Sequence, residues 1–370
     1  MGLIRGGKSA QAGSNRVLIV AEEQDFGKVK IRSCSVSADP DEWRLIRGLS
    51  CGKDNAVNSF PARRTVVQPP SWIAPTLREV FEKAGTTAHR LASGSAGWVE
   101  RLGDDAMISY KDEATLKELD EGLTRWSVDS GWSPVRVFKR FLPIKNDERI
   151  SPVLHRGDAS LPLTTVVTEA GIRYGLDFAA GYSHGLFLDQ RANRAQLRLL
   201  RPKKLLNTFA YTCSFSVVGA LAGAETLSVD LSKKSLDRGK QNLELNDVKE
   251  GKHRFIADDA MQLIPRLETR GERFDVIILD PPTFSRNNQG RLWQVEQHFE
   301  DLVNAALEIA MPKCSILLST NCTKLDPVAL ERRSRMCAKI KRRTVDYLRI
   351  PSLPDFPPGH GASTLWMMVR

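Results

Sequence analysis

The chain of 370 residues has little of several features that mark particular classes of protein. Its six cysteines include no C-x-x-C pair, and a core of this size needs no disulfides, so a reducing compartment without structural zinc is expected. No apolar run is long enough to cross a membrane, and no secretory signal stands out. No repeat of fixed period is present. These absences leave a globular protein with neither a membrane span nor a resident metal.

Acidic residues are fewer than basic ones, 44 against 54, which gives a formal net charge of +10 and a pI near 9.4. This excess favours a polyanionic partner. The densest basic run covers residues 332–343, on a helix for which Asp326 is the expected cap and Pro327 the expected first residue. Two further basic clusters lie at residues 198–204 and, interleaved with phenylalanines, at residues 136–141. Any one of these clusters is more often a solvated helix face than a phosphate site, but the excess over the whole chain favours phosphate contacts.

The pattern changes twice along the chain. Residues 1–70 are rich in Gly, Ser, Arg and Lys and have little periodicity, which predicts a poorly structured N-terminal extension. Residues 71–165 mix short strands with helices, which predicts a small α+β domain, and residues 166–370 alternate strictly between strands and helices. The first sixteen residues lack acids, as an organelle transit peptide would, but Glu22 and Glu23 argue against a long one.

The segment FDVIILDPPTF, which ends at Phe284, is the most informative in the chain. Residues 276–279 form an unbroken apolar run typical of a central strand in a parallel sheet. Because Pro281 and Pro282 end the strand, Asp280 is expected at the carboxyl edge of the sheet, where open α/β folds bind ligands. An acid, a rigid turn and an aromatic ring suit a nucleobase. A strand-ending turn with a packed phenylalanine is the plainer alternative.

The surrounding segments continue this pattern, with three strands that each end in an acid: Asp230, Asp258 and Asp280. Such alternation predicts a parallel sheet with right-handed crossovers. The expected strands cover residues 205–210, 226–230, 253–258, 276–279 and 315–320, and the expected helices cover residues 215–224, 232–246, 260–267 and 292–310.

Taken in order, these pieces resemble class I S-adenosylmethionine-dependent methyltransferases, and among them the bacterial enzymes that methylate bases of 23S ribosomal RNA. The resemblance is carried by GLFLDQR at residues 185–191, NTFAYTCSFS at 207–216, DLSKKSL from Asp230 and DPPTFS from Asp280. It covers the second half of the chain well and residues 85–165 more faintly. It implies an α/β fold with a Rossmann-like, mostly parallel seven-stranded sheet. Residues 345–350 and 363–369 would close the sheet as an antiparallel pair.

The resemblance also implies the cofactor, S-adenosyl-L-methionine, and the residues that bind it. Asp230 resembles the acid that accepts both ribose hydroxyls, which two carboxylate oxygens can do, and Asp258 resembles the residue that binds the adenine amino group. For each acid alone, a helix cap or a surface charge would be the simpler explanation. The full cofactor set implied is Phe187, Asp189, Gln190, Arg191, Asn207, Phe209, Tyr211, Thr212, Cys213, Ser214, Asp230, Leu231, Asp258, Asp259 and Asp280.

One segment departs from the family pattern. The turn after the first strand is usually Thr-Gly-Gly, which lets the backbone approach the cofactor, but here it is Thr212-Cys213-Ser214. This departure keeps open a second class of protein, an RNA-binding protein that retains the fold without catalysis. A nicotinamide enzyme is disfavoured, because the turn lacks G-x-G-x-x-G.

Cys322 follows the strand at residues 315–320 by two positions, on the same sheet edge as Asp280. Relatives that make 5-methylcytosine resemble the chain here, and in them a thiolate adds to carbon 6 so that carbon 5 becomes nucleophilic. The catalytic residues expected are Asp280, Pro281, Pro282, Phe284 and Cys322. Two alternatives stay open: Cys322 is a small buried residue, or Asp280 and Phe284 position a guanine for non-covalent methylation at a ring nitrogen or exocyclic amine.

The expected partner is RNA, either ribosomal RNA or a ribosomal particle, because an extruded base must reach the methyl donor. The resemblance suggests that residues 71–165 help to dock this RNA. No membrane partner is expected, and the oligomeric state stays open, with a homodimer as one option. The expected location is the cytoplasm, or an organelle if the N-terminal extension is a transit peptide.

Overall fold

The computed structural model describes residues 23–26, 29–32, 69–142, 149–249, 251–286, 290, 292–357 and 359–370. The chain divides into two compact units, Met1–Thr65 and Val66–Arg370. In the first unit, β1 (Glu23–Phe26) and β2 (Val29–Arg32) form a two-stranded antiparallel sheet. The other residues of the predicted extension up to residue 68, including those considered as a transit peptide, lie outside the described residues.

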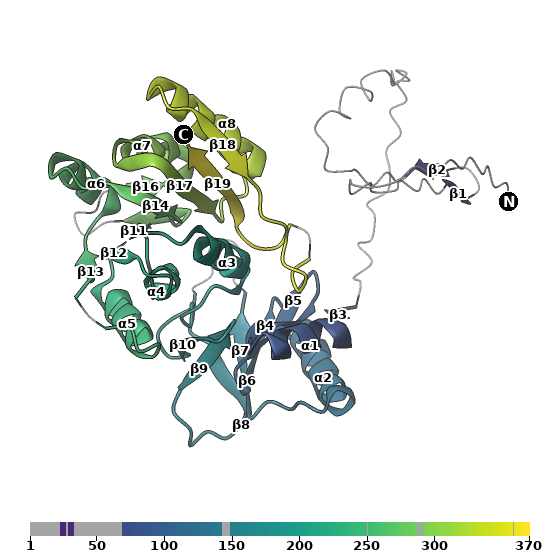
Figure 1. The fold of residues 1–370 in the computed structure, drawn as a ribbon. Helices are drawn as coiled ribbons and strands as arrows, with labels where there is room; N and C mark the ends of the chain where they lie inside the picture. The colour runs from purple at the N-terminus through teal and green to yellow at the C-terminus, as the bar shows by residue number, and fades with distance from the viewer. Residues whose placement is uncertain are drawn as a thin grey trace, which may run out of the picture. The chain divides into compact units, whose positions relative to one another are not determined.

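The second unit begins with a six-stranded sheet, seen in blue in Figure 1. Its strands follow the chain in order from β3 to β8. All neighbouring pairs are antiparallel except β6 and β7, which α2 joins as a parallel crossover. The elements are β3 (Ser71–Trp72), α1 (Pro75–Lys83), β4 (Ala88–Ser93), β5 (Gly97–Leu102), β6 (Asp105–Tyr110), α2 (Glu113–Ser130), β7 (Arg136–Phe141) and β8 (Val153–Gly157).

Helix α2 covers one face of this sheet. The Asp112 side chain caps the helix by accepting a hydrogen bond from the Thr115 amide at 2.8 Å, and Gly131 ends it with a φ of 69°. Its leucines pack on alternate residues of four strands, because side chains in a strand point to opposite faces in turn. This core comprises Leu91, Val99, Ile108 and Val137 from the strands and Leu116, Leu119 and Leu123 from the helix.

A hairpin that the sequence reading did not identify follows the six-stranded sheet. It consists of β9 (Thr164–Glu169) and β10 (Ile172–Asp177). The Thr87 amide, next to β4, donates to the Thr168 carbonyl at 2.9 Å, so the hairpin is attached to the small sheet. The chain then continues through the short 3-10 helix η3 (Leu188–Gln190) into α3 (Arg191–Leu200).

The predicted seven-stranded sheet is confirmed, with the order β13-β12-β11-β14-β17-β19-β18. The first five strands are parallel, and β19 pairs antiparallel with both β17 and β18. The elements are β11 (Lys204–Thr208), α4 (Ser214–Leu221), β12 (Glu225–Asp230), α5 (Lys233–Glu244), β13 (His253–Ala257), α6 (Ala260–Thr269), β14 (Phe274–Leu279), β15 (Phe284–Arg286), β16 (Leu292–Gln294), α7 (Val295–Glu308), β17 (Ala310–Thr320), α8 (Pro327–Ile340), β18 (Val345–Leu348) and β19 (Ser363–Val369).

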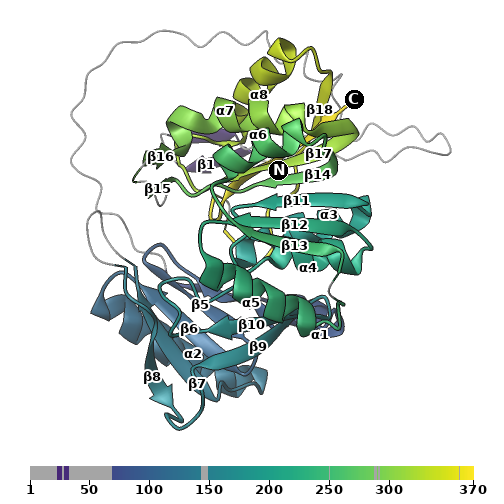
Figure 2. The ribbon, with the colours of Figure 1, turned by 90° about the vertical axis from the view of Figure 1, so that its left-hand side faces the viewer.

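Helices cover both faces of the large sheet, as Figure 2 shows edge-on. Helices α6, α7 and α8 pack on one face, with Phe299 and Leu330 in its core. Helices α3, α4 and α5 pack on the other, where Leu197 and Val217 are buried. Both faces are apolar, which explains why residues 276–279 form a continuous apolar run rather than an alternating one. In the described part of the chain, no helix is long and apolar enough to cross a membrane.

Several predicted boundaries differ from the structure: the strand expected over residues 315–320 begins at Ala310, and the helix expected over residues 215–224 ends at Leu221. The helix expected over residues 292–310 begins at Val295, because Leu292–Gln294 forms strand β16 instead. This short strand pairs antiparallel with β15, which contains Phe284, and the Trp293 indole donates to the Pro282 carbonyl at 3.2 Å. The hairpin therefore fixes the residues that follow Asp280 at the carboxyl edge of the sheet.

Candidate active site

Two adjoining cavities open at the carboxyl ends of the parallel strands. The larger has a volume of about 850 Å³, and Asp230 and Asp280 both line it. The smaller, of about 240 Å³, is lined by Asp258 and Asp259. The two share four lining residues: Phe209, Asp230, Leu231 and Ser285. The acids that end three strands thus meet at one continuous site, of the size that small-molecule sites have.

The turn between β11 and α4 has an unusual backbone. Phe209, Tyr211 and Cys213 have φ values of 53°, 50° and 60°, in the left-handed region that residues with a side chain seldom adopt. The turn is held in place by side chains: the Tyr211 hydroxyl donates to the Ser183 carbonyl at 2.6 Å, and the Thr212 hydroxyl donates to the Gly185 carbonyl. The turn therefore keeps a glycine-type conformation without glycine.

Each carboxylate oxygen of Asp230 already accepts one backbone hydrogen bond. Oδ2 accepts from the Tyr211 amide and Oδ1 from the Ser232 amide, both at 2.8 Å. Burial raises the pKa of Asp230, and these two bonds oppose the effect. Because a carboxylate has about four acceptor positions, two remain for a ligand at the wall between the cavities.

Asp258 and Asp259 lie at the end of β13, in the smaller cavity. Asp258 accepts from the Asp259 amide at 2.8 Å and forms an ion pair with Arg266. Asp259 caps α6 by accepting from the Met261 amide at 2.9 Å. Both acids thus have a structural partner as well as a position in the cavity wall.

Asp280 is connected to the GLFLDQR segment through a residue that the sequence reading missed. The Gln190 amide donates to Ser319 Oγ at 2.8 Å, and the Ser319 side chain hydrogen bonds to Asp280. Burial raises the pKa of Asp280 to about 6, and the bond from Ser319 opposes this rise. The parallel register, in which Leu279 pairs with Leu318, puts Asp280 beside Ser319.

The side chains of the GLFLDQR segment do not all face the large cavity. Phe187, Asp189 and Gln190 line the large cavity. Arg191 does not line this cavity. Its guanidinium forms a buried ion pair with Asp355 and donates to the Ala88 carbonyl at 3.2 Å. This arginine connects the small sheet to the C-terminal loop.

Arg194, one turn further along α3, does line the large cavity. It is only 1% exposed and forms a two-point ion pair with Glu169, with distances of 2.7 Å and 2.6 Å. The same guanidinium donates to the Phe187 carbonyl at 2.9 Å and lies 3.4 Å from Ser214 Oγ. Arg194 therefore holds the hairpin, the GLFLDQR segment and the start of α4 together.

The cavity wall near Asp280 includes the remaining DPPTF residues, Pro281, Pro282, Thr283 and Phe284. The Phe284 side chain is 55% exposed, which is unusual for a phenylalanine and leaves a ring face available at the cavity mouth. The alternative of a packed phenylalanine is therefore wrong. An exposed ring beside a buried acid is a suitable surface for a flat heterocycle.

Two cysteines named from the sequence lie away from the cavity. Cys322 is 7% exposed and belongs to the apolar core with Leu325 and Leu330, whereas its neighbour Asn321 lines the cavity. Cys213 is fully buried against α5, and a Cβ at Gly239 would come within 2.3 Å of its sulfur. The neighbouring Ser214 does line the cavity.

Several cavity residues were not identified from sequence. They are Arg149, Tyr182, Ser183, Gly185, Arg194, Ala210, Phe215, Thr283, Ser285 and Asn321. Gly185, Ala210, Phe215, Thr283 and Ser285 lie inside the motifs quoted from the sequence, but no site role was assigned to them. Arg149, Tyr182, Ser183 and Arg194 do not follow strands of the large sheet, so strand-end patterns could not indicate them. Asn321 directly follows a strand end. Within the described residues, no cluster of three or more His, Cys, Asp or Glu side chains could hold a metal ion.

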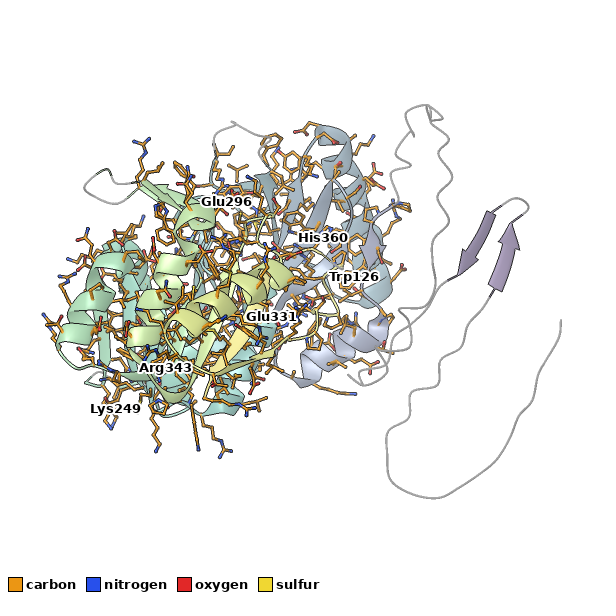
Figure 3. All side chains as sticks on the ribbon, turned by 90° about the horizontal axis from the view of Figure 1, so that it is seen from above. Trp126, Lys249, Glu296, Glu331, Arg343 and His360 are labelled. Atoms are coloured by element: carbon orange, nitrogen blue, oxygen red, sulfur yellow. The ribbon has the colours of Figure 1, made fainter. Side chains whose placement is uncertain are left out.

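The basic clusters are partly neutralised. On α8, capped by Asp326 as predicted, Arg333 pairs with Glu300, and Arg335 pairs with Glu331, which Figure 3 labels on this helix. On β7, Arg136 is buried in a two-point ion pair with Asp105, so the phosphate contact expected of Arg136 is wrong. A buried, fully paired guanidinium cannot reach a polyanion.

Comparison with known proteins identifies the family. A family model described as S-adenosylmethionine-dependent methyltransferase matches residues 83–368, which include both cavities and most of the small sheet. The chain belongs to this family. Its cofactor is accordingly S-adenosylmethionine, and the predicted class I fold is confirmed.

Curated relatives match a shorter segment of this methyltransferase. A protein named ribosomal RNA large subunit methyltransferase I, from Serratia proteamaculans, is 37% identical over 171 residues. Its counterpart from Yersinia pseudotuberculosis is 36% identical over 171 residues. Each match covers 46% of this chain and 43% of the relative, so the chain matches less than half the length of these relatives.

Solved structures share the fold across most of the methyltransferase. The protein SMU.776, crystallised with SAH, superposes with a TM-score of 0.68 at 24% identity, over 80% of this chain and 78% of that one. A SAM dependent methyltransferase from Agrobacterium tumefaciens gives a TM-score of 0.59 at 23% identity, over 77% and 90%.

The residues present fit the cofactor. Asp230 has free acceptor positions for a diol, and Leu231 and Met261 supply apolar walls for a purine.

Proposed function

We propose that this methyltransferase modifies a base of large-subunit ribosomal RNA in the cytoplasm. One observation carries the proposal: Asp230 and Asp280 line a single cavity, at whose mouth Phe284 exposes its ring. An RNA base that leaves its stack needs an acidic side chain that hydrogen-bonds to its edge and an aromatic ring that stacks on its face. The net charge of +10 favours a polyanionic substrate, and the relatives from Serratia and Yersinia carry the name of ribosomal RNA methyltransferases.

For the cofactor, we propose that Asp230 accepts the ribose hydroxyls and that Asp258 and Asp259 face the adenine in the smaller cavity. The start of α4, which Arg194 holds in place through Ser214, would bind the methionine carboxylate, and Phe187, Asp189 and Gln190 would enclose that end. When bound, S-adenosylmethionine supplies a methyl group on a positively charged sulfur. The side chains of Arg191 and Cys213 act indirectly in this scheme, because they anchor the loops on which the direct contacts lie.

For the substrate, we propose that Asp280 accepts a hydrogen bond from an N–H group of the base and takes its proton as the nitrogen is methylated. A pKa near 6 leaves this carboxyl mostly ionised at neutral pH and yet basic enough for the transfer. Phe284 would stack on the base. A guanine ring nitrogen or exocyclic amine fits this scheme.

Methylation of cytosine carbon 5 through a Cys322 thiolate is the competing scheme. The thiol lies in the apolar core, outside the cavity wall, which disfavours direct attack on a base. The non-covalent scheme is therefore the one we put forward.

Three variants separate the two schemes: C322S, C314S and D280N. Cys314 is the matched control, because it is an equally buried cysteine of the same core. We expect C322S and C314S to transfer methyl groups to ribosomal RNA within about threefold of the wild type, and D280N to lose at least about 100-fold. The assay uses radiolabelled S-adenosylmethionine and RNA from a deletion strain, followed by mass spectrometry of the nucleosides.

A folded C322S protein without activity, beside an active C314S protein, would establish the thiolate scheme. A covalent complex of the wild type with RNA that contains 5-fluorocytosine would do the same. If the wild type methylates no ribosomal RNA from the deletion strain, the proposed substrate is wrong.

A further inference from the structure

A third cavity, of about 260 Å³, lies between the small sheet and the segment at residues 182–189. The large cavity adjoins it, because both are lined by Tyr182, Ser183, Phe187, Asp189, Tyr211 and Asn321. The floor of the third cavity comes from strands of the small sheet, on the face opposite α2. In the proposed function, no part of the cofactor is placed in this third cavity.

A stripe of polar residues crosses that floor. Arg90, Glu100, Ser109 and Arg140 come from four neighbouring strands, β4 to β7, and all four are buried. Arg140 donates to Ser109 Oγ at 2.9 Å and to Glu100 Oε2 at 3.3 Å, so these three side chains satisfy one another. Arg90 is left with only a 3.9 Å approach to Glu100.

The Arg90 guanidinium is packed between side chains, yet two of its nitrogens lack a hydrogen-bond partner within the described residues. It lies between two aromatic rings, 4.5 Å from the centre of Trp98 and 4.0 Å from that of Phe356. Its Nε and Nη1 atoms are buried and without a partner among the described residues. Burial lowers the pKa of Arg90, and the nearby carboxylates of Glu100, Asp189 and Asp355 oppose the effect.

Two more side chains of the same cavity have buried polar atoms without partners in the described part of the chain. They are the Trp98 Nε1 atom and both ring nitrogens of His184, which is 4% exposed. Burial lowers the pKa of His184 to about 3, so this imidazole is neutral and offers one donor and one acceptor. Native proteins give nearly all buried polar groups a hydrogen-bond partner, since each unpaired group lowers the stability of the folded state. Three in one cavity indicate a polar ligand.

The inventory of these groups defines the ligand. Arg90 offers N–H donors in a fixed plane, Trp98 offers one donor, and His184 offers another. Glu100 is engaged by Arg140, and Asp189 accepts a hydrogen bond from the Ala362 amide, so neither carboxylate hydrogen-bonds to the Arg90 guanidinium. An anion with several acceptor oxygens satisfies these donors, and a phosphate has that geometry. Arg149 continues the positive charge toward the large cavity, with its guanidinium 5.6 Å from the centre of the Tyr182 ring.

We propose that this cavity binds a backbone phosphate of the substrate RNA, next to the nucleotide whose base enters the large cavity. The inference rests on the proposed function, which supplies the RNA. The shared walls make the two cavities neighbours, as a base and the phosphate beside it must be. A phosphate bound in this cavity would hold the RNA strand in place while the neighbouring base leaves its stack.

The test uses binding of the full-length protein to its ribosomal RNA in the presence of S-adenosylhomocysteine, so that no methyl transfer is required. The variants are R90M, R90K, H184F and the control R125M, which removes an exposed charge from α2, the helix on the other face of the sheet. We expect R90M to weaken RNA binding about tenfold and to reduce the slope of log Kd against log salt by about 0.7. R90K should restore the slope but not the full affinity, and R125M should change neither.

H184F separates a binding role from a structural one. It removes two unpaired buried nitrogens, so the melting temperature should stay or rise while RNA affinity falls several-fold. If R90M and H184F fold and bind the RNA as the wild type does, the inference is wrong, even where the wild type methylates that RNA. Inorganic phosphate is the second probe. If it raises the melting temperature of the wild type but not of R90M, while RNA affinity is equal in both, the cavity serves a free anion and the inference is overturned.

Discussion

The carboxyl group of Asp280 lies where its ionised form is disfavoured. Burial raises its pKa to about 6, and nearby Asp189 adds to the rise. An aspartate in the unfolded chain ionises near pH 4, so between about pH 4 and 6 the folded protein keeps a proton that the unfolded chain has lost. The folded state is thus favoured below pH 4, and this advantage disappears as the pH rises through 6. Above that pH, the folded protein carries the cost of a buried charge.

The D280N variant should therefore be more stable than the wild type at pH 7.5 and yet inactive. The gain in free energy of unfolding should reach up to about 3 kcal/mol, which is the energy of a shift of about two pKa units, and it should vanish near pH 4. Urea unfolding at both pH values measures it. D237N, at an exposed acid on α5, is the control and should change stability by less than about 0.5 kcal/mol. A loss of stability at pH 7.5 in D280N would contradict the argument.

The contact between Cys213 and Gly239 shows how the turn without glycine is accommodated. Cys213 has a left-handed backbone, and its sulfur occupies the space that a side chain at position 239 would need. We expect G239A to lower the free energy of unfolding by about 1–3 kcal/mol, because the added methyl group overlaps the sulfur. The double variant C213G/G239A should recover much of this loss, since glycine removes the sulfur and suits the positive φ.

A double-mutant cycle by urea unfolding measures that coupling. The second readout is calorimetric binding of S-adenosylmethionine, which should follow the stability of the turn. If the two substitutions have additive effects on the free energy of unfolding, contact between the added methyl group and the Cys213 sulfur does not destabilise the turn. The presence of cysteine rather than glycine at position 213 then has another cause.

Residues of the same type that lie close together in the sequence can have different surroundings in the folded protein. Asp230 and Asp280 could be predicted as cavity residues because each ends a parallel strand, and parallel strands end at one edge. Arg191 and Arg194 could not be told apart, since only the tertiary structure places Asp355 beside the first and Glu169 beside the second. Ser319 was hidden for a similar reason, because its contact with Asp280 depends on the register of two strands.

At the scale of elements, the hairpin β9–β10 is attached to the helices of the large sheet by apolar packing, by hydrogen bonds to Asn242 and Asn246, and by one buried ion pair. Glu169, at the end of β9, meets Arg194 on α3, and both are almost fully buried. The sequence reading missed this hairpin because its alternation is short and its partners are distant in the chain. The predicted helices and strands of the large sheet, by contrast, carried long periodic patterns, which depend only on local sequence.

Removing the charge of Glu169 should test how much this pair supports the cavity. We expect E169Q to lower the free energy of unfolding by about 3–5 kcal/mol, because it leaves the Arg194 cation buried without a counter-ion. S-adenosylmethionine should also bind more weakly, since Arg194 orients the Phe187 carbonyl and Ser214. The double variant E169L/R194M, which removes both charges, should recover stability but not cofactor affinity. Recovery of both would assign Arg194 a purely structural role.

At the scale of the whole molecule, the Val66–Arg370 unit contains every residue named at the three cavities and the large apolar cores. The family match also begins only at residue 83. A protein that starts at Val66 should therefore unfold in one cooperative transition and bind S-adenosylmethionine with a Kd within about twofold of the full chain. Calorimetry of unfolding and of binding measures both quantities.

A shorter protein that starts at residue 86 is the matched control. It lacks Trp72, which packs against the core under α2, and Phe81, whose ring lies 4.7 Å from the Arg191 guanidinium and stacks on His89 at 4.4 Å. Loss of these two rings should lower stability by several kcal/mol, because each buries a large apolar surface. Because Arg191 anchors the loop next to Asp189, cofactor binding should weaken as well. If the chain that starts at Val66 loses cofactor affinity more than about tenfold, residues before it contribute to the site.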